Sequence, residues 1–164
     1  MDIKILFINE LSSKVYNDGL LLSYATTGSS GVDLRAVAVS CDGESFSLES
    51  GVFILKSGSR CLVKCGIAIQ MNESFIEAQV RSRSGLALKN GVMVLNSPGT
   101  IDSDYRGEIG VILQNFDSKD FTINIGDRIA QLVFSRIEKV NFDFVSSIDQ
   151  TKRGDGGFGS TGKS

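Results

Sequence analysis

Apolar and polar residues alternate along much of this chain, in short stretches separated by turns. In residues 108–115, Ile109, Val111 and Leu113 alternate with polar or small neighbours. A period of two residues is the pattern of a strand that buries one face. We therefore predict about ten short strands. They lie in residues 3–7, 32–37, 46–48, 52–54, 61–71, 75–80, 108–115, 121–125, 129–137 and 140–145.

One segment has a different character. Ser84–Gly91 places good helix formers between a serine start and a glycine stop, and it is the only helix that we expect. Leu11–Tyr24 remains ambiguous. The 18 glycines and the single proline suit many turns between short strands. The pattern as a whole predicts an all-β fold, a jelly-roll-like sandwich or barrel with one short helix.

The end of the chain is rich in glycine and has neither a strand nor a helix period. We expect a β domain over residues 1–150 and a mobile C-terminal segment over residues 151–164. A disordered terminus is the simplest interpretation. However, Phe158 stands between glycines and close to Arg153, Ser160 and Thr161, which favours a functional segment.

Residues 157–164 also match the phosphate-binding pattern GxxxxGK[ST]. That motif needs a strand before it and a helix after it, and we expect no helix after Ser164. We interpret the match as a glycine-rich segment whose backbone amides can wrap phosphates.

The charge balance limits the classes of partner. With 17 basic and 19 acidic residues, the chain has no overall field that favours nucleic acid or an anionic membrane. No apolar run approaches membrane-spanning length, and we interpret the first ten residues as a strand and not as an export signal. We therefore expect a cytoplasmic protein without a nucleic-acid or membrane partner.

The chain contains no histidine, which excludes the commonest general base and histidine-ligated metals. An enzyme built from this sequence would therefore use a carboxylate base. The three cysteines, Cys41, Cys61 and Cys65, form no CxxC motif. We predict that Cys61 and Cys65 are small buried apolar residues, and a catalytic thiol is the alternative.

The stretch Gly99–Gly107 places several side chains capable of catalysis or binding close together in the sequence. Asp102 and Asp104 lie two residues apart, and Tyr105 and Arg106 follow them directly. If residues 101–105 are extended, both carboxylates share one face, which suggests a cation or a proton-transfer role. Exposed carboxylates in a turn are the alternative.

Five segments, in this order, resemble the motifs of the trimeric dUTP diphosphatase (dUTPase) family. They are Ser30–Ala36, Arg83–Ala87, Gly99–Gly107, Gly126–Leu132 and Arg153–Gly162. The chain departs from the family at Ser82, Ser57 and Asn72, where prolines are usual. We expect these departures to affect the rigidity of turns more than the chemistry.

The resemblance implies a jelly-roll homotrimer with tails shared between subunits. It would use Mg²⁺ to hydrolyse dUTP to dUMP and pyrophosphate, limiting uracil incorporation into DNA and supplying dUMP for dTMP synthesis. Asp102 would be the general base that activates water to attack the α-phosphorus. Tyr105 would lie beneath the deoxyribose and exclude a 2′-hydroxyl. Asp104 is expected to be structural.

The same resemblance implies the binding residues. Uracil would meet the backbone of Gly99, Thr100, Ile101 and Gly110 and the side chain of Asn96. The triphosphate would be bound by Arg83, Ser84, Gly85 and Gln131. Mg²⁺ would be held mainly by phosphates, with Asp33 and Gln131 touching its waters. The tail would act as a lid through the residues Arg153, Phe158, Gly159, Ser160 and Thr161.

Two other functions stay open. The same fold could serve as a dUTP-sensing regulatory protein, or the chain could be a relative of dCTP deaminase. Product analysis with dUTP, dCTP and ATP would distinguish the three.

Overall fold

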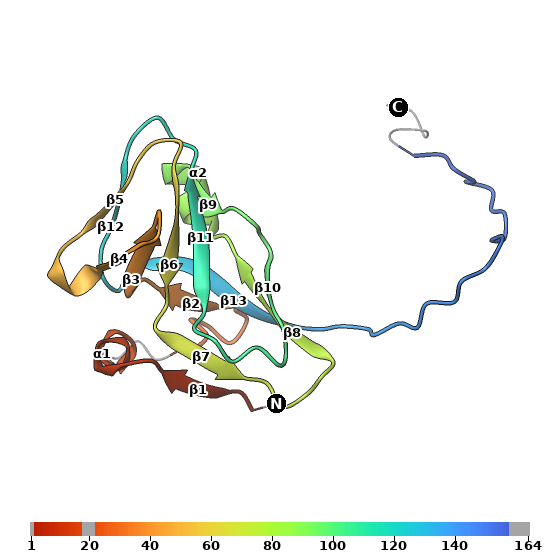
Figure 1. The fold of residues 1–164 in the computed structure, drawn as a ribbon, viewed down its shortest axis with the longest axis horizontal. Helices are drawn as coiled ribbons and strands as arrows, with labels where there is room; N and C mark the ends of the chain where they lie inside the picture. Colours follow the sequence, from red (N-terminus) through yellow and green to blue (C-terminus); the bar gives the residue numbers. More distant parts are fainter. Residues whose placement is uncertain (1, 18–21, 158–164) are drawn as a thin grey trace.

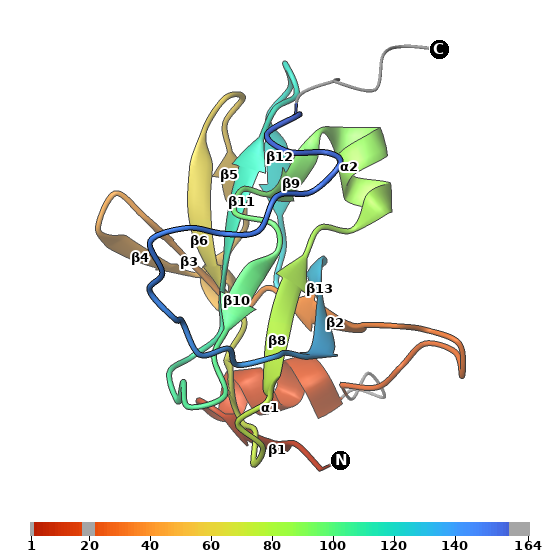
Figure 2. The same ribbon diagram turned by 90° about the vertical axis from the view of Figure 1, so that its right-hand side faces the viewer.

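The fold is an antiparallel β-sandwich. A computed structural model describes residues 2–17 and 22–157. One sheet has the strand order β4-β3-β6-β11-β9, and the other has the order β10-β8-β13-β2 (Figures 1 and 2). Two short pairs, β1-β7 and β12-β5, extend the sandwich.

The strands have the following bounds. The five-stranded sheet contains β3 (Ala38–Cys41), β4 (Glu44–Ser47), β6 (Arg60–Lys64), β9 (Val92–Val94) and β11 (Gly110–Asn115). The four-stranded sheet contains β2 (Val32–Arg35), β8 (Ile76–Arg81), β10 (Gly99–Ile101) and β13 (Arg128–Arg136). The pairs are formed by β1 (Lys4–Phe7), β7 (Ile67–Gln70), β5 (Phe53–Leu55) and β12 (Phe121–Ile123).

The predicted alternation produces the core. In β11, Val111 and Leu113 are fully buried, whereas Ile112 between them is only partly buried. Leu34 and Leu132, from the four-stranded sheet, belong to the same cluster of buried residues. The inner faces of both sheets therefore form one core, and the all-β prediction is confirmed.

The prediction of a single helix is wrong. The expected helix α2 (Ser84–Asn90) is present and ends at Gly91, whose φ of 62° suits glycine. A second helix, α1 (Glu10–Asn17), and a 3₁₀ turn, η1 (Leu48–Ser50), accompany it. Asn9 caps α1, because its Oδ1 accepts the Ser12 amide at 2.9 Å. The helix also buries Ser12 and Tyr16, four residues apart on one face, so tertiary packing stabilises it.

The strand predicted for residues 140–145 is not formed. After β13 ends at Arg136, the chain leaves the body as a long arm, drawn in blue in Figure 1. Phe142 and Phe144 are 82% and 95% exposed. Their alternating pattern is typical of a strand, but in the described residues no strand of this chain pairs with them. The expected domain boundary after residue 150 stays a prediction.

Of the helices in residues 2–17 and 22–157, none has the length and apolar character needed to cross a membrane.

Candidate active site

A polar depression of about 480 Å³ opens beside β2, β13 and the start of α2. It brings together five of the site residues predicted from the sequence, and its lining also includes residues that were not predicted, among them one further charged side chain. The predicted residues are Asp33, Arg83, Ser84, Gly85 and Gln131, and the further charged one is Arg128. We call this depression the phosphate pocket.

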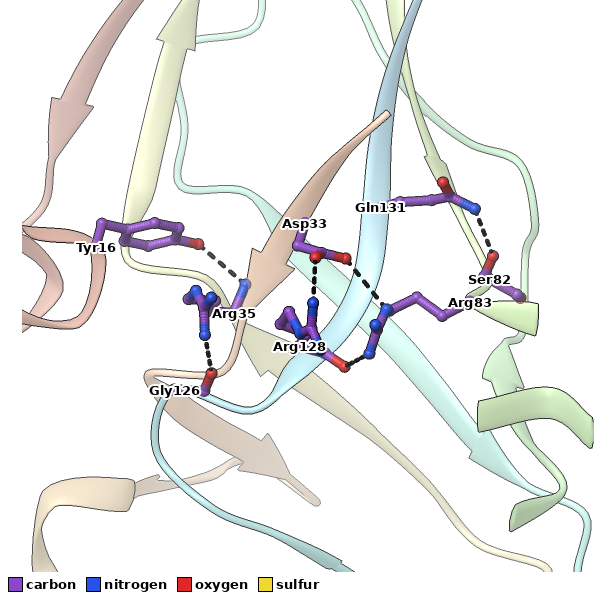
Figure 3. A network of polar contacts seen from close by, with 8 residues as sticks. All are labelled: Tyr16, Asp33, Arg35, Ser82, Arg83, Gly126, Arg128 and Gln131. Carbon is purple, nitrogen blue, oxygen red and sulfur yellow. Dashed lines mark hydrogen bonds and ion pairs between the residues drawn. The ribbon is translucent and has the colours of Figure 1, made fainter. Parts of the chain in front are cut away.

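Two guanidinium groups meet at one carboxylate in this pocket. Asp33 Oδ1 lies 3.1 Å from Arg83 Nε, and Asp33 Oδ2 lies 3.2 Å from Arg128 NH1 (Figure 3). Arg83 NH1 also donates to the Arg128 carbonyl at 2.8 Å. One negative charge thus faces two positive ones, so the cluster has an excess of positive charge. Guanidinium groups bind phosphate oxygens well, because their N–H donors form a fork.

A β-bulge explains why Arg128 reaches this cluster. Arg128 pairs with Arg35, but Ala130 pairs with Leu34, so Ile129 is an extra residue in β13. Residues that pair directly across two strands share a face, so Arg128 faces the same side as Arg35. Strict alternation from Gln131 would instead place Arg128 on the opposite face. A period of two cannot reveal the bulge, so the sequence pattern does not predict Arg128 at this site.

Gln131 pairs with Asp33 across β13 and β2. Its Nε2 donates to the Ser82 carbonyl at 3.0 Å, which leaves Oε1 free to act as an acceptor. Asp33 and Gln131 therefore supply the oxygen donors that Mg²⁺ prefers. Among the described residues, no group of three His, Cys, Asp or Glu side chains could hold a metal ion. The oxygens of Asp33 and Gln131 fit a magnesium ion that takes most of its ligands from phosphates and water.

The start of α2 forms one wall of the pocket. Arg83 is the N-cap residue, and no side chain in the described part of the chain bonds to the helix start as a cap. The first-turn amides therefore remain available to a ligand. The phosphate-binding role of Ser84 and Gly85 stays a prediction.

Ser82 stands where the resemblance led us to expect proline, and its side chain fixes the turn. The Ser82 hydroxyl accepts the Val94 amide at 2.9 Å and so joins the end of β8 to β9. A proline would lack this acceptor.

We expect Ser82→Ala to lower the free energy of unfolding by about 1 kcal/mol, because the Val94 amide loses its acceptor. Urea denaturation would measure the change, with the exposed Ser45→Ala as the control. Equal stability of the two variants would show that the hydrogen bond contributes nothing.

The predicted uracil-binding residues lie on adjacent segments. Gly99 is buried, and a Cβ added there would lie 3.2 Å from Asn96 Nδ2. The segment before β10 runs beside β11, because the Leu95 amide donates to the Ile112 carbonyl at 2.9 Å. Gly110, the first residue of β11, is two positions from Ile112. Thr100 and Ile101 pair with Gln79 and Ala78 of β8.

The segment after β10 is a turn. The Tyr105 amide donates to the Asp102 carbonyl at 3.1 Å, and Arg106 NH1 donates to the Ser103 carbonyl at 2.9 Å. Residues 101–105 are therefore not extended throughout, and both carboxylates are exposed in a turn. The proton-transfer role of Asp102 stays a prediction. The Tyr105 hydroxyl donates to the Glu108 carbonyl at 3.1 Å.

Asp102 lies outside the phosphate pocket. It lines a second depression, together with Asp104, Glu77 and Lys139. Ile101, at the end of β10, pairs with Ala78 of β8. Asp33 of β2 pairs with Gln131 of β13, which in turn pairs with Arg81 of β8.

The two depressions lie at opposite edges of the four-stranded sheet, whose edge strands are β10 and β2 (Figure 2). Three inter-strand spacings and three residues along the strands separate Ile101 from Asp33, which amounts to roughly 17 Å. Within one chain, the predicted base therefore does not face the predicted phosphate site.

Another depression, of about 610 Å³, lies elsewhere and contains none of the predicted site residues. It opens on β3 and β6, beside Cys41 and Cys61. Burial raises the pKa of the Cys61 thiol to about 12 and also raises the pKa of Cys65. These thiols stay protonated near neutral pH and are weak nucleophiles. The prediction that Cys61 and Cys65 are buried is confirmed.

Comparisons with known proteins show which family the chain resembles. A model of the dUTPase family matches residues 48–162. The chain is 51% identical over 142 residues to the deoxyuridine 5′-triphosphate nucleotidohydrolase of Anaplasma marginale, covering 87% of this chain and 88% of that protein. It is 48% identical over 151 residues to the Helicobacter pylori protein of the same name, covering 92% and 94%. The chain belongs to the dUTPase family.

Solved dUTPase structures share the fold. A point mutant of the dUTPase of Staphylococcus bacteriophage 80alpha, solved with dUpNHpp, superimposes with a TM-score of 0.77 at 18% identity, covering 98% of both chains. A point mutant of the dUTPase from phage phi11 of S. aureus, described with a structural Mg(II) ion, gives a TM-score of 0.71 at 17% identity. That comparison covers 92% of this chain and 100% of the phage chain. The predicted jelly-roll-like fold is confirmed.

The fifth dUTPase motif is only partly described. Arg153 lies on the arm, where its Nε donates to the Gly156 carbonyl at 2.8 Å. The other predicted lid residues, Phe158, Gly159, Ser160 and Thr161, lie outside the described residues.

Proposed function

We propose that this chain is a cytoplasmic enzyme that hydrolyses dUTP to dUMP and pyrophosphate, which limits uracil incorporation into DNA and supplies dUMP for dTMP synthesis. The observation that carries the proposal is the phosphate pocket, where Arg83 and Arg128 converge on Asp33 beside the open start of α2. Membership in the dUTPase family supports dUTP as the substrate.

The test is product analysis with purified protein and Mg²⁺. Conversion of dUTP to dUMP and pyrophosphate, with dCTP and ATP left intact, is the expected result. Recovery of a deaminated nucleotide from dCTP would favour the dCTP deaminase alternative. Tight binding of dUTP without turnover would favour the regulatory protein.

The triphosphate would bind to the side chains of Arg83 and Ser84 and to the backbone amide of Gly85. Asp33 holds both guanidinium groups when no ligand is bound, so an arriving phosphate competes with it for them. The Asp33 carboxylate would then lose its positively charged partners, and another cation would have to replace them.

Asp33 and Gln131 are the residues that would contact magnesium-bound waters, because both offer oxygens to the pocket. When bound, Mg²⁺ neutralises phosphate charge and polarises the phosphoryl group under attack. Arg83 would position the phosphate chain of the nucleotide and so exclude other orientations of that chain.

Asp102 would take the proton from the attacking water, since the chain has no histidine for this task. A backbone hydrogen bond from the Tyr105 amide to the Asp102 carbonyl closes its turn, and Asp102 is exposed. Asn96 and the backbone of Gly99–Ile101 and Gly110 would bind uracil by hydrogen bonds.

The separation of Asp102 from the phosphate pocket supports a site shared between chains. Because the two regions lie at opposite edges of one sheet, a nucleotide that touches both is best accommodated between two copies. The exposed apolar side chains of the arm, such as Phe142 and Phe144, favour docking onto a neighbouring subunit. We propose a homotrimer in which the tails close over the sites of other subunits.

Tyr105→Ala is expected to relax sugar selection. The tyrosine ring would lie against the deoxyribose and leave no room for a 2′-hydroxyl, so its removal should raise UTP hydrolysis relative to dUTP. The ratio of kcat/KM for UTP and dUTP measures this effect. Tyr105→Phe is the matched control, because it keeps the ring and loses only the bond to the Glu108 carbonyl. A ratio that is the same in both variants and in the native chain would refute the steric role.

A further inference from the structure

Helix α1 carries a buried tyrosine that contacts the strand of Asp33. The Tyr16 side chain is fully buried, and its ring packs against Phe7 with centroids 6.0 Å apart. The Tyr16 hydroxyl oxygen accepts the Arg35 amide at 3.1 Å (Figure 3). Arg35 lies two residues after Asp33 at the end of β2, which is an edge strand of its sheet.

Arg35 also stands at the bulge of β13. It pairs with Arg128, next to the extra residue Ile129. Its NH1 donates to the Gly126 carbonyl at 2.8 Å. The Ala36 amide donates to the Asp127 carbonyl at 2.9 Å. These bonds hold the residues that immediately precede Arg128.

From this arrangement we propose that Tyr16 is a positioning residue for the phosphate pocket. It fixes the backbone of Arg35, Arg35 fixes the turn before Arg128, and the bulge then directs the Arg128 guanidinium to Asp33. The inference rests on the proposed function, because it assigns α1 a role in binding the phosphates of the nucleotide.

The physical reason is the weakness of this corner. A bulge interrupts the regular pairing of two strands, and an edge strand has a neighbour on one side only. The end of β2 therefore depends on bonds from outside its sheet. Tyr16 supplies such a bond from a buried site, where an unsatisfied amide is costly.

Tyr16→Phe tests the role, because it keeps the ring packing and removes only the acceptor. A buried hydroxyl also contributes to stability, so loss of stability alone does not distinguish positioning from a structural role. Leu55→Val is the control, since Leu55 is 1% exposed and lies on β5, outside the network of Figure 3. It is expected to lower stability by a comparable amount.

Calorimetry with Mg²⁺ would compare the affinities for dUpNHpp and for dUMP. We expect Tyr16→Phe to weaken the affinity for dUpNHpp by about 3- to 10-fold and to leave the affinity for dUMP within about twofold of the native value. The reason is that only dUpNHpp fills the whole phosphate pocket. Leu55→Val should change neither affinity. An unchanged ratio of the two affinities in the native chain and both variants would overturn the inference.

Two further measurements cover a variant that folds poorly. Arg35→Met breaks the bond to Gly126 at the other end of the network, and it should produce the same selective loss of dUpNHpp affinity. Hydrogen exchange should be faster in Tyr16→Phe at the amides of Arg35, Ala36 and Gly126, and unchanged at Leu113. Unchanged exchange at Arg35 would overturn the inference on its own.

The outcomes separate this inference from the proposed function. If the native chain binds dUpNHpp and Tyr16→Phe behaves like Leu55→Val, only the role of Tyr16 fails. If the native chain neither binds dUpNHpp nor hydrolyses dUTP, the proposed function fails, and the phosphate-positioning role fails with it.

Discussion

Asp102→Asn is expected to lower kcat for dUTP hydrolysis by about 10²- to 10⁴-fold, while the chain still folds and binds dUpNHpp. Asparagine keeps the size of the side chain and the turn in which the Tyr105 amide bonds to the residue 102 carbonyl. It cannot accept a proton from water near neutral pH, so the loss should fall on the chemical step. Pyrophosphate release measures kcat, and calorimetry measures binding.

Asp104→Asn is the matched control for this experiment. Asp104 is a second exposed carboxylate of the same turn and lines the same depression. We expect its kcat to stay within about twofold of the native value. Near-native turnover by Asp102→Asn would remove Asp102 from the role of base. Equal losses in both variants would attribute the effect to the charge of the turn.

A chain that ends at Gln150 is expected to fold and assemble as the full chain does, and to lose most of its activity. The described part of the removed segment, residues 151–157, contributes no strand, helix or core residue. Its hydrogen bonds, such as the one from the Gly154 amide to the Thr151 carbonyl, are local. Circular dichroism, sedimentation and kcat/KM would separate folding, assembly and catalysis. Lys163→Ala in the full chain is the control, because no role is assigned to Lys163.

Crossed complementation tests whether the tail serves another subunit. The Asp102→Asn chain has a tail but no base, and the truncated chain has a base but no tail. Unfolded together and refolded, they should form mixed trimers with activity well above that of either parent refolded alone. Mixed trimers as inactive as their parents would mean that each tail serves its own subunit or none.

The strands could be predicted from the sequence because burial alternates locally. Val111 and Leu113 are buried as the period of two indicates, and α2 lies where its serine and glycine boundaries place it. Helix α1 could not be predicted in this way. Its stability depends on the burial of Tyr16 against residues distant in the chain, which no local pattern records. Residues 140–145 have the alternation of a strand, but pairing depends on a partner that the pattern does not specify.

The candidate site, like the fold, could be predicted from the sequence only in part. The resemblance placed Arg83 and Gln131 at the triphosphate and Asp33 and Gln131 at its magnesium ion, and the structure brings these residues together. The sequence pattern does not predict Arg128 at this site, because the bulge at Ile129 changes which side of β13 it faces. The separation of Asp102 from the pocket follows from the order β10-β8-β13-β2, and strand order is a property of the whole chain.

That separation has a consequence for how the enzyme responds to dilution. On the proposal that the nucleotide spans two copies, a lone chain contains both halves of a site but no complete one. Below the dissociation constant of the assembly, the rate per chain should fall as the chains are diluted, so turnover becomes more than first order in protein. The nucleotide would also stabilise the assembly, since it binds a pair of subunits more tightly than it binds either subunit alone. Adding dUpNHpp should therefore slow the exchange of subunits between trimers, although it would change no contact between the proteins themselves.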